Sequence, residues 1–439
     1  MSVEPRSTKR NRSQDFAPLT NTKIPKNLLV AFAEERNASG GRRSVKGGLV
    51  LGRVQTIFAA LAFSASVSAH GALAETLDIN VVLPLTGGGA FLGKAEQQAL
   101  QLFEKAAAAD TVHGKPVKFV FHDDQSSPQI AVQLVNSIKV SAPPVIIGSA
   151  LSGLCNAMGP LVRNGPVLYC LSPSMNPKPG EFVFSSSVST KGLAEGLLRY
   201  FRDRGWKNIG LITSTDATGQ DAYKNITASV GKGDLADIKI VAEAQFNPTE
   251  VSASALVQRI KGANPDAVIA WSTGAPIGTI FKAIRDAGFE VPVGTTDGNM
   301  TYAQMEQYAS FLPKELYIPA PQWLKSENGD TSPKAAAAKA SFYKAFEAAD
   351  VKPDGPSTFA WDPALLVVSA LKALPEKADA DTLRNHLNNL QEFGGINGVY
   401  DFKRDPQRGL DKSNVIVTRW DTSAGTWIPV SDVGGTALK

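Results

Sequence analysis

Small hydroxyl residues follow an apolar stretch at 145–148 of this 439-residue chain. Residues 148–153 read Gly-Ser-Ala-Leu-Ser-Gly and lead into a stretch with helical spacing. Hydroxyl groups and the free N–H groups of a helix end suit a carboxylate, and the helix dipole adds attraction. Ser152 has a second reading as a helix N-cap, and both roles can hold together. These residues therefore predict binding of an anionic group.

Polar side chains also follow other expected strands. Residues 171–177 read Leu-Ser-Pro-Ser-Met-Asn-Pro, and the segments 215–219 and 295–299 occupy corresponding positions in the second half of the chain. Ligands of open parallel sheets bind at the carboxyl ends of the strands, so these loops predict a ligand site. Asp297 would receive an ammonium or hydroxyl group of the ligand. The alternatives are rigid proline turns and an Asp-Gly turn.

The motifs of common enzymes are incomplete. The glycines at 87–89 are followed by Leu92 where a dinucleotide-binding loop needs its third glycine, so they form either a simple turn or a close backbone approach to a ligand. Ala150 and Leu154 stand where a hydrolase nucleophile elbow needs glycines. We interpret 122–124, His-Asp-Asp, as a solvated corner between strand and helix, with Asp capping. No catalytic residue and no cofactor are predicted, and the protein is expected not to be an enzyme.

Cys155 and Cys170 are the only cysteines. In an oxidising compartment they would form one disulfide, whereas the alternative is two buried small apolar residues. Two cysteines cannot form a zinc site alone, and His113, His122 and His386 are not spaced as companions. No metal site is therefore expected.

The elements that must position these loops follow an α/β pattern. Short β-branched stretches alternate with longer helical ones, which is typical of a mostly parallel sheet covered by helices, and the theme occurs in two halves. We predict strands at 77–83, 117–122, 145–148 and 167–171, then at 209–213, 238–244, 267–271 and 291–294. Predicted helices lie at 93–109, 128–141, 152–164, 191–204, 219–230, 252–261 and 277–287, and later at 334–349, 357–374 and 380–389. The chain closes with predicted antiparallel strands at 399–402, 414–420 and 426–428.

The first 74 residues are expected to be absent from the working protein. An apolar run at 54–67 follows Arg53 and precedes Ala-Leu-Ala at 72–74, which is typical of a signal peptide (53–74). Residues 1–52 would be a presequence, through either a later start or a long basic leader. Residues 1–74 hold 11 of the 45 Lys+Arg and 4 of the 41 Asp+Glu, so the remainder carries 34 basic and 37 acidic residues. This balance offers no basic face, so nucleic acid is not expected as a partner. The signal peptide predicts a soluble periplasmic protein.

The remaining 365 residues exceed the size at which one core usually divides, so two lobes are expected. We assign 75–189 with 319–410 to the first lobe and 190–318 with 411–435 to the second.

These motifs, in this order, resemble the periplasmic solute-binding proteins of ABC transporters, in particular the leucine/isoleucine/valine-binding (branched-chain amino acid) family. The resemblance spans essentially the whole chain after residue 74. The segments that carry it are 83–87 with Gly93, 123–124, 147–152, 172–174, 296–298 and 359–361. It implies a type I periplasmic binding protein fold of two α/β lobes joined by three hinge crossings, which close on a ligand and then dock to a membrane permease.

The resemblance also implies the ligand contacts. Ser152 would bind the ligand carboxylate, Ser174 and Asn176 would share the carboxylate and α-amino group, and Asp297 would meet the α-ammonium. The implied binding residues are Leu92, Ala150, Leu151, Ser152, Ser174, Met175, Asn176, Thr218, Asp297 and Phe359. Tyrosines are common in the family where Leu92 and Thr218 stand. The walls implied here are smaller or less aromatic and leave more room than a leucine, isoleucine or valine needs, so a larger amino acid, an aromatic carboxylate and an amide are open as ligands.

Three functions follow from these observations. The first is the ligand-binding component of an ABC uptake transporter for amino acids or related small carboxylates, acting as a monomer. The second is an exported ligand-sensing receptor built from the same pair of lobes. The third is an exported α/β hydrolase, in which Ser152 or Asp297 would be catalytic, and turnover by the pure protein would distinguish it.

Overall fold

The computed structural model describes residues 75–324 and 332–438, so the predicted presequence (1–52) and signal peptide (53–74) lie outside the described residues. The first described strand, β1 (Leu77–Leu83), shows how the sheets are buried. Successive side chains of a strand point to opposite faces, and Val81 and Val82 accordingly join two separate apolar clusters. The sheet is therefore covered on both faces, as apolar β-branched stretches predict.

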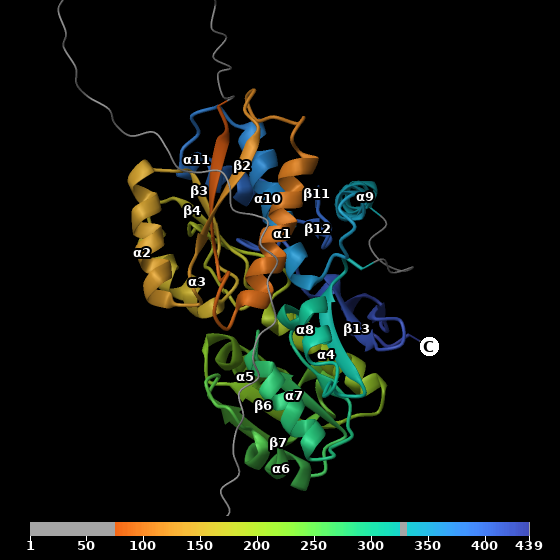
Figure 1. Ribbon diagram of the computed structural model, residues 1–439. Coiled ribbons are helices and arrows are strands. Elements are labelled where there is room, and N and C mark those ends of the chain that lie inside the picture. Colours follow the sequence, from red (N-terminus) through yellow and green to blue (C-terminus); the bar gives the residue numbers. More distant parts are fainter. Residues whose placement is uncertain (1–74, 325–331, 439) are drawn as a thin grey trace, which may run out of the picture. The chain divides into compact units, whose positions relative to one another are not determined.

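The first sheet has the strand order β2-β1-β3-β4-β5, and every neighbouring pair is parallel. We call this sheet and the helices packed on it lobe 1. Helices α2 and α3 cover one face, and α1 lies beside α10 on the other (Figure 1). Its strands after β1 are β2 (Val117–Asp123), β3 (Val145–Gly148), β4 (Val167–Cys170) and β5 (Val183–Ser185). Its helices are α1 (Ala90–Ala106), α2 (Pro128–Ile138), α3 (Ser152–Met158), α9 (Pro333–Glu347), α10 (Gly355–Ala373) and α11 (Ala380–Asn389), with a small hairpin of β11 (Phe393–Gly394) and β12 (Val399–Tyr400).

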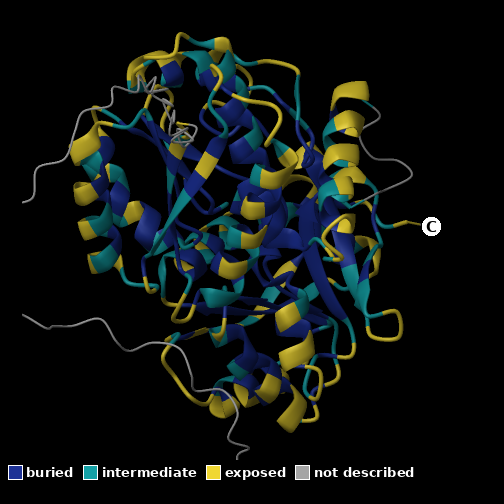
Figure 2. Cartoon of the chain, turned by 45° about the horizontal axis from the view of Figure 1, so that its top comes forward, coloured by how far each residue is buried: buried dark blue, intermediate teal, exposed yellow. Residues whose placement is uncertain are grey.

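The second sheet has the order β14-β13-β10-β9-β8-β6-β7 and defines lobe 2. Strands β7 to β10 and β6 pair in parallel, whereas β13 and β14 form an antiparallel hairpin at one edge. Its strands are β6 (Asn208–Ser214), β7 (Lys239–Phe246), β8 (Ala267–Trp271), β9 (Val293–Gly294), β10 (Leu316–Pro321), β13 (Val415–Asp421) and β14 (Thr426–Pro429). Its helices are α4 (Thr190–Asp203), α5 (Ala217–Ser229), α6 (Ser254–Gly262), α7 (Pro276–Asp286) and α8 (Tyr302–Gln307). Figure 2 shows the strands buried beneath helices whose outer faces are exposed.

The chain passes between the two lobes three times. The first passage lies between β5 and α4, the second between β10 and α9, and the third between β12 and β13. The predicted α/β fold with two mostly parallel sheets is confirmed. The lobe boundaries at 189, 318 and 410 stay a prediction.

Most predicted elements lie within a few residues of those observed, and β3, β8 and α11 have the predicted bounds. Helix α1 begins at Ala90, earlier than predicted, because Gly89 already stands at its N-cap position. The helix predicted at 152–164 is α3 followed by the 3₁₀ turn η2 (Gly159–Val162), which contains Pro160. These differences lie at the ends of elements, where propensity is weakest.

Strand β10 was not predicted, since its Pro319 and Pro321 argue against a strand in the middle of a sheet. The structure shows how it tolerates them. Only Leu316 and Tyr317 pair with β9, so the prolines lie beyond that ladder. Proline has no N–H to donate, and the backbone oxygen of Val417 opposite Pro319 accepts instead from the N–H of Val430, at 2.9 Å.

A disulfide joins Cys155 of α3 to Cys170 at the end of β4, with a Cα–Cα distance of 6.1 Å. Of the two alternatives for these cysteines, the structure shows the disulfide and not two free thiols. The bond ties the start of α3 to the neighbouring strand, and both elements lead into the polar loops.

Candidate functional site

Three hydroxyl groups meet where β3, β4 and β6 end. Ser152 Oγ lies 2.7 Å from Ser172 Oγ and 3.0 Å from Thr218 Oγ1. Ser152 begins α3 and Ser172 follows β4, both in lobe 1, whereas Thr218 lies in the first turn of α5 in lobe 2. All three are buried. We call Ser152, Ser172 and Thr218 the hydroxyl cluster, and it connects the two lobes directly.

The predicted N-cap role of Ser152 is wrong. Leu151 occupies the N-cap position of α3, and the Ser152 hydroxyl bonds only to the two other hydroxyls of the cluster among the described contacts. Neither partner is a base, so the geometry lacks the histidine that activates a serine nucleophile. The arrangement suits hydrogen bonding to a ligand.

The loop after β4 contributes a second set of contacts. Ser174 donates its N–H to Ser172 Oγ (3.4 Å) and accepts from Thr190 Oγ1 (3.1 Å). Asn176 is exposed, and its Nδ2 lies 3.2 Å from Asp221 Oδ1 on α5. Ser174 therefore adjoins the hydroxyl cluster, while Asn176 forms a second contact between the lobes at the surface.

Asp297 is fully buried in lobe 2, in the 3₁₀ turn η4 (Asp297–Asn299) after β9. Its Oδ1 accepts from Thr296 Oγ1 (2.9 Å), and its Oδ2 accepts from Ser187 Oγ (3.2 Å) in the first passage between the lobes. Burial raises the pKa of this carboxyl to about 7, and the hydrogen bonds offset only part of that effect. A cationic group beside Asp297 would relieve the cost of burying its charge.

The remaining predicted residues are apolar and largely buried. A Cβ placed at Gly298 would lie 3.4 Å from Leu92 Cδ2, so Leu92 of lobe 1 packs against Gly298, the residue after Asp297 in lobe 2. The backbone oxygen of Phe359 accepts from Ser186 Oγ (2.8 Å) in the first passage. Ala150, Leu151 and Met175 belong to the loops that carry Ser152 and Ser174.

Sequence reasoning missed Arg408, which positions the polar loops. Its buried guanidinium donates to the backbone oxygens of Ser187 (3.0 Å), Ser186 (3.3 Å), Pro173 (3.2 Å) and Met175. One side chain thus joins the first passage to the loop after β4. It lies in an irregular segment before β13, and a lone arginine there gives no signal in the sequence.

Glu96 was also missed, and Asp124 was misjudged. Glu96 is fully buried on α1, and a glutamate on the apolar face of a helix is the signal that could have found it. The solvated corner predicted at 122–124 is wrong for Asp124, which is fully buried and accepts from Ser149 Oγ (2.6 Å) and Ser126 N (2.8 Å). The Ser149 hydroxyl, which follows β3, compensates the buried carboxylate of Asp124 with a hydrogen bond.

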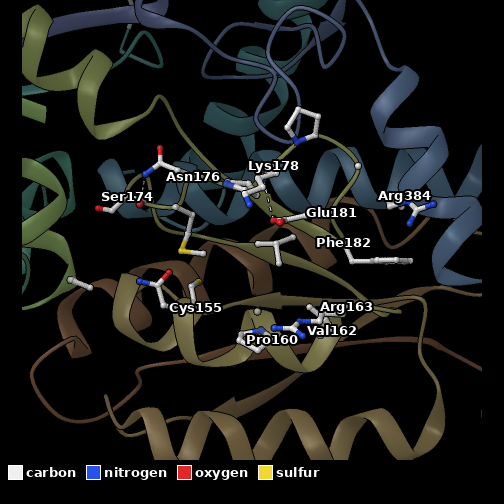
Figure 3. Close-up of a pocket in the computed structure, with 18 of the residues that line it drawn as sticks. Cys155, Pro160, Val162, Arg163, Ser174, Asn176, Lys178, Glu181, Phe182 and Arg384 are labelled. Carbon is white, nitrogen blue, oxygen red and sulfur yellow. Dashed lines mark hydrogen bonds between the residues drawn. The ribbon is translucent and has the colours of Figure 1, made fainter. Parts of the chain in front are cut away.

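A cavity of about 830 Å³ lies beside the loop after β4, and it is lined by three of the predicted site residues but not by Ser152, Thr218 or Asp297. Ser174, Met175 and Asn176 line it from lobe 1, and Ala217 and Asp221 line it from α5 of lobe 2. Figure 3 shows Ser174 and Asn176 across the cavity from Cys155 of α3. Its volume lies in the usual range for small-molecule sites.

Within 75–324 and 332–438, no group of three or more His, Cys, Asp or Glu side chains is placed to hold a metal ion. In the same ranges, no helix is both long enough and apolar enough to cross a membrane.

The chain is similar to known proteins over most of its length. Residues 76–426 match the periplasmic binding protein family. A search of curated proteins found no match.

Solved structures share the fold. An extracellular ligand-binding receptor from Rhodopseudomonas palustris HaA2 is 21% identical, with a TM-score of 0.71 over 81% of this chain and 99% of that one. The branched-chain amino acid transporter substrate-binding protein LivJ of Streptococcus pneumoniae, in complex with isoleucine, is 21% identical, with a TM-score of 0.67 over 81% and 100%. An ABC transporter solute-binding protein of R. palustris, in complex with benzoate, is 18% identical, with a TM-score of 0.64 over 83% and 98%.

These identities are low and carry the fold alone, but the family match covers the two lobes and the polar loops between them. The chain therefore belongs to the periplasmic binding protein family.

Proposed function

We propose that this protein is the extracytoplasmic ligand-binding component of an ABC uptake transporter for amino acids or related small carboxylates. The observation that carries the proposal is the hydroxyl cluster, because its three hydroxyls come from both lobes and meet within 3.0 Å. A ligand carboxylate that bonds to these groups contacts both lobes at once. Such contacts favour the closed form, which is how hinge closure is driven.

The ligand contacts follow from the chemistry of the site. Ser152 and Ser174 offer hydroxyls to a carboxylate, and buried Asp297 offers a carboxylate to an ammonium group. Leu92, Ala150, Leu151, Met175, Thr218 and Phe359 would form the walls, with Asn176 at the surface. Isoleucine and benzoate, the ligands in the similar structures, are both carboxylates.

The wider role follows the same proposal. The signal peptide at 53–74 would export the protein to the periplasm, where it would act as a soluble monomer and deliver its ligand to a membrane permease. Binding would proceed without turnover, because the proposed contacts are hydrogen bonds and ion pairs. No cofactor or nucleic acid takes part.

The experiment is a binding titration of the Ser152→Ala variant. Loss of a hydrogen bond to a charged group costs about 1.5–3 kcal/mol, so affinity for a carboxylate ligand should fall about 10–100-fold. Ser431→Ala is the matched control, since Ser431 is equally buried but hydrogen-bonds within lobe 2. Equal affinity in Ser152→Ala and the parent protein would contradict the proposal.

A further inference from the structure

Glu96 is a buried acid whose two carboxyl oxygens have no hydrogen-bond partner among the described residues. Other acids of the interior differ in this respect. Asp124 accepts from Ser149, Asp354 accepts from Ser357, and Asp362 accepts from the N–H of Ile396. Buried polar groups are nearly always paired, because an unpaired one loses its hydration without compensation. The carboxyl of Glu96 therefore needs a partner from outside the described chain.

Glu96 belongs to the face of α1 that borders the candidate site. It lies one helical turn after Leu92, and these two positions share a face of the helix. Leu92 packs at Gly298, next to Asp297. The face that carries Glu96 thus begins at the proposed ligand position.

Two other acids raise the pKa of the Glu96 carboxyl. Burial raises its pKa well above the ordinary value, and the charges of Asp124 and Asp354 raise it further. Asp124 is held by Ser149, which directly precedes the loop of Ala150 and Ser152. Asp124 thus links Glu96 electrostatically to the strand end that carries Ser149 and Ser152.

The second of these acids lies at the start of α10. Asp354 is the N-cap of this helix, which also carries Phe359. A Cβ placed at the adjacent Gly355 would lie 3.0 Å from the backbone oxygen of Asp297. The two acids that act on Glu96 thus follow β2 and cap α10. Each leads to the proposed site, because Asp124 bonds to Ser149 after β3 and Gly355 packs against the backbone of Asp297.

No basic side chain of the described interior is left to pair with Glu96. Arg408 is the only Lys, Arg or His among the buried side chains of the described ranges. Its guanidinium donates to four backbone oxygens. A nitrogen group of the ligand is therefore a candidate donor for Glu96.

We propose that Glu96 is a specificity residue that receives an N–H donor from the far end of the ligand. The ligand is then an amino acid or small carboxylate that carries a second nitrogen group, such as an amine, an amide or a guanidine. Its carboxylate binds the hydroxyl cluster, its α-ammonium binds Asp297 and its second nitrogen binds Glu96. This inference rests on the proposed function and adds the substrate class.

The test compares pairs of probes that differ only at the far end. Lysine is paired with norleucine, glutamine with methionine, and 4-aminobenzoate with benzoate, each titrated calorimetrically into the purified protein. The nitrogen-bearing member of at least one pair should bind about tenfold more tightly or better, as expected for a hydrogen bond that satisfies a buried and otherwise unpaired polar group. In Glu96→Leu the two members of the pair should bind with equal affinity, because the substitution removes the acceptor and leaves an apolar wall.

Asp354→Asn is the matched control, since Asn caps a helix as well as Asp and the variant removes a neighbouring charge while Glu96 remains. It should keep the ratio. Because each result is a ratio of two affinities of one variant, a change in folding stability does not alter it.

Apolar members that bind the parent protein as tightly as their partners, or a ratio that survives in Glu96→Leu, would overturn this inference and leave the proposed function standing. Absence of binding by every probe would contradict the proposed function, and the inference with it.

Discussion

Asp297 shows how one side chain can link ligand binding to pH. Its carboxyl is fully buried, and among the described side chains it is bonded to the hydroxyls of Thr296 and Ser187. Desolvation is the largest influence on it, and the pKa is raised to about 7. In the absence of ligand the folded protein therefore holds a proton on Asp297 at pH values where the unfolded chain has lost it.

The raised pKa of Asp297 determines how folding stability and ligand affinity change with pH. The pKa of Asp297 is above its unfolded value of 3.8, so the contribution of this group to stability is largest at low pH and is lost as the pH rises towards 7. An ammonium ligand needs the charged carboxylate. Its affinity should therefore fall as the pH drops below 7, by up to about tenfold for each pH unit.

Titrations of an ammonium-bearing ligand at several pH values would check this prediction. Asp297→Asn should bind weakly at every pH and lose the dependence near neutrality. Asp124, Asp354 and Asp362, whose pKa values are raised to about 6 by burial, and Glu96, whose pKa is raised well above its ordinary value, remain in this variant and contribute any pH dependence that is left. A pH dependence that persists unchanged in Asp297→Asn would assign it to another group.

At the scale of elements, Gly93 near the start of α1 lets that helix pack closely on the end of β1. A Cβ at Gly93 would lie 2.3 Å from the backbone oxygen of Pro84, which is far closer than real contacts. Gly93 is therefore required by the close approach of α1 to the end of β1. Helix α1 carries Leu92 and Glu96, so this contact also sets the position of two proposed ligand residues.

We expect Gly93→Ala to lower the free energy of unfolding by about 1–3 kcal/mol, the usual cost of overpacking. Gly88→Ala, in the turn before α1, is the control, because a Cβ there meets nothing within 4 Å. Its effect should stay within about 0.5 kcal/mol. Chemical denaturation of both variants makes the comparison, and equal losses would show that α1 shifts without strain.

The elements themselves were largely predictable from the sequence, because apolar runs such as those of β3 and β8 are bounded by turn residues. Strand β10 was missed because its prolines are tolerated only where β9 stops short, a fact of tertiary structure. Glu96 and Arg408 were missed for a related reason. Their burial depends on which distant segments pack around them, and a single glutamate or arginine in the sequence does not reveal that.

At the scale of the whole molecule, the lobes also meet through backbone atoms. The N–H of Ala275 in lobe 2 donates to the backbone oxygen of Gly88 in lobe 1, at 3.0 Å. A Cβ at the adjacent Gly274 would lie 2.4 Å from that same oxygen. Gly274 thus permits the approach of the two lobes that closure on a ligand requires.

Gly274→Ala should therefore weaken ligand binding by about tenfold, because it lowers the population of the closed form. Gly288→Ala is the matched control, since Gly288 also has a positive φ (54° against 82°) but a Cβ there meets nothing within 4 Å. Both variants carry the backbone strain of a non-glycine residue, and only the first obstructs the lobes. Equal affinity in the two variants, measured by calorimetry, would show that this contact does not govern closure.

The most direct test of ligand binding between the lobes is a thermal-shift measurement of the purified protein with lysine, glutamine, isoleucine, benzoate and 4-aminobenzoate. At a hundredfold excess over its dissociation constant, a ligand of the native state adds about 2.7 kcal/mol of stability. We predict a clear shift with at least one of these carboxylates, recovered chemically unchanged after incubation. A protein that shifts with none of them, or that consumes one, would contradict the assignment as a binding component.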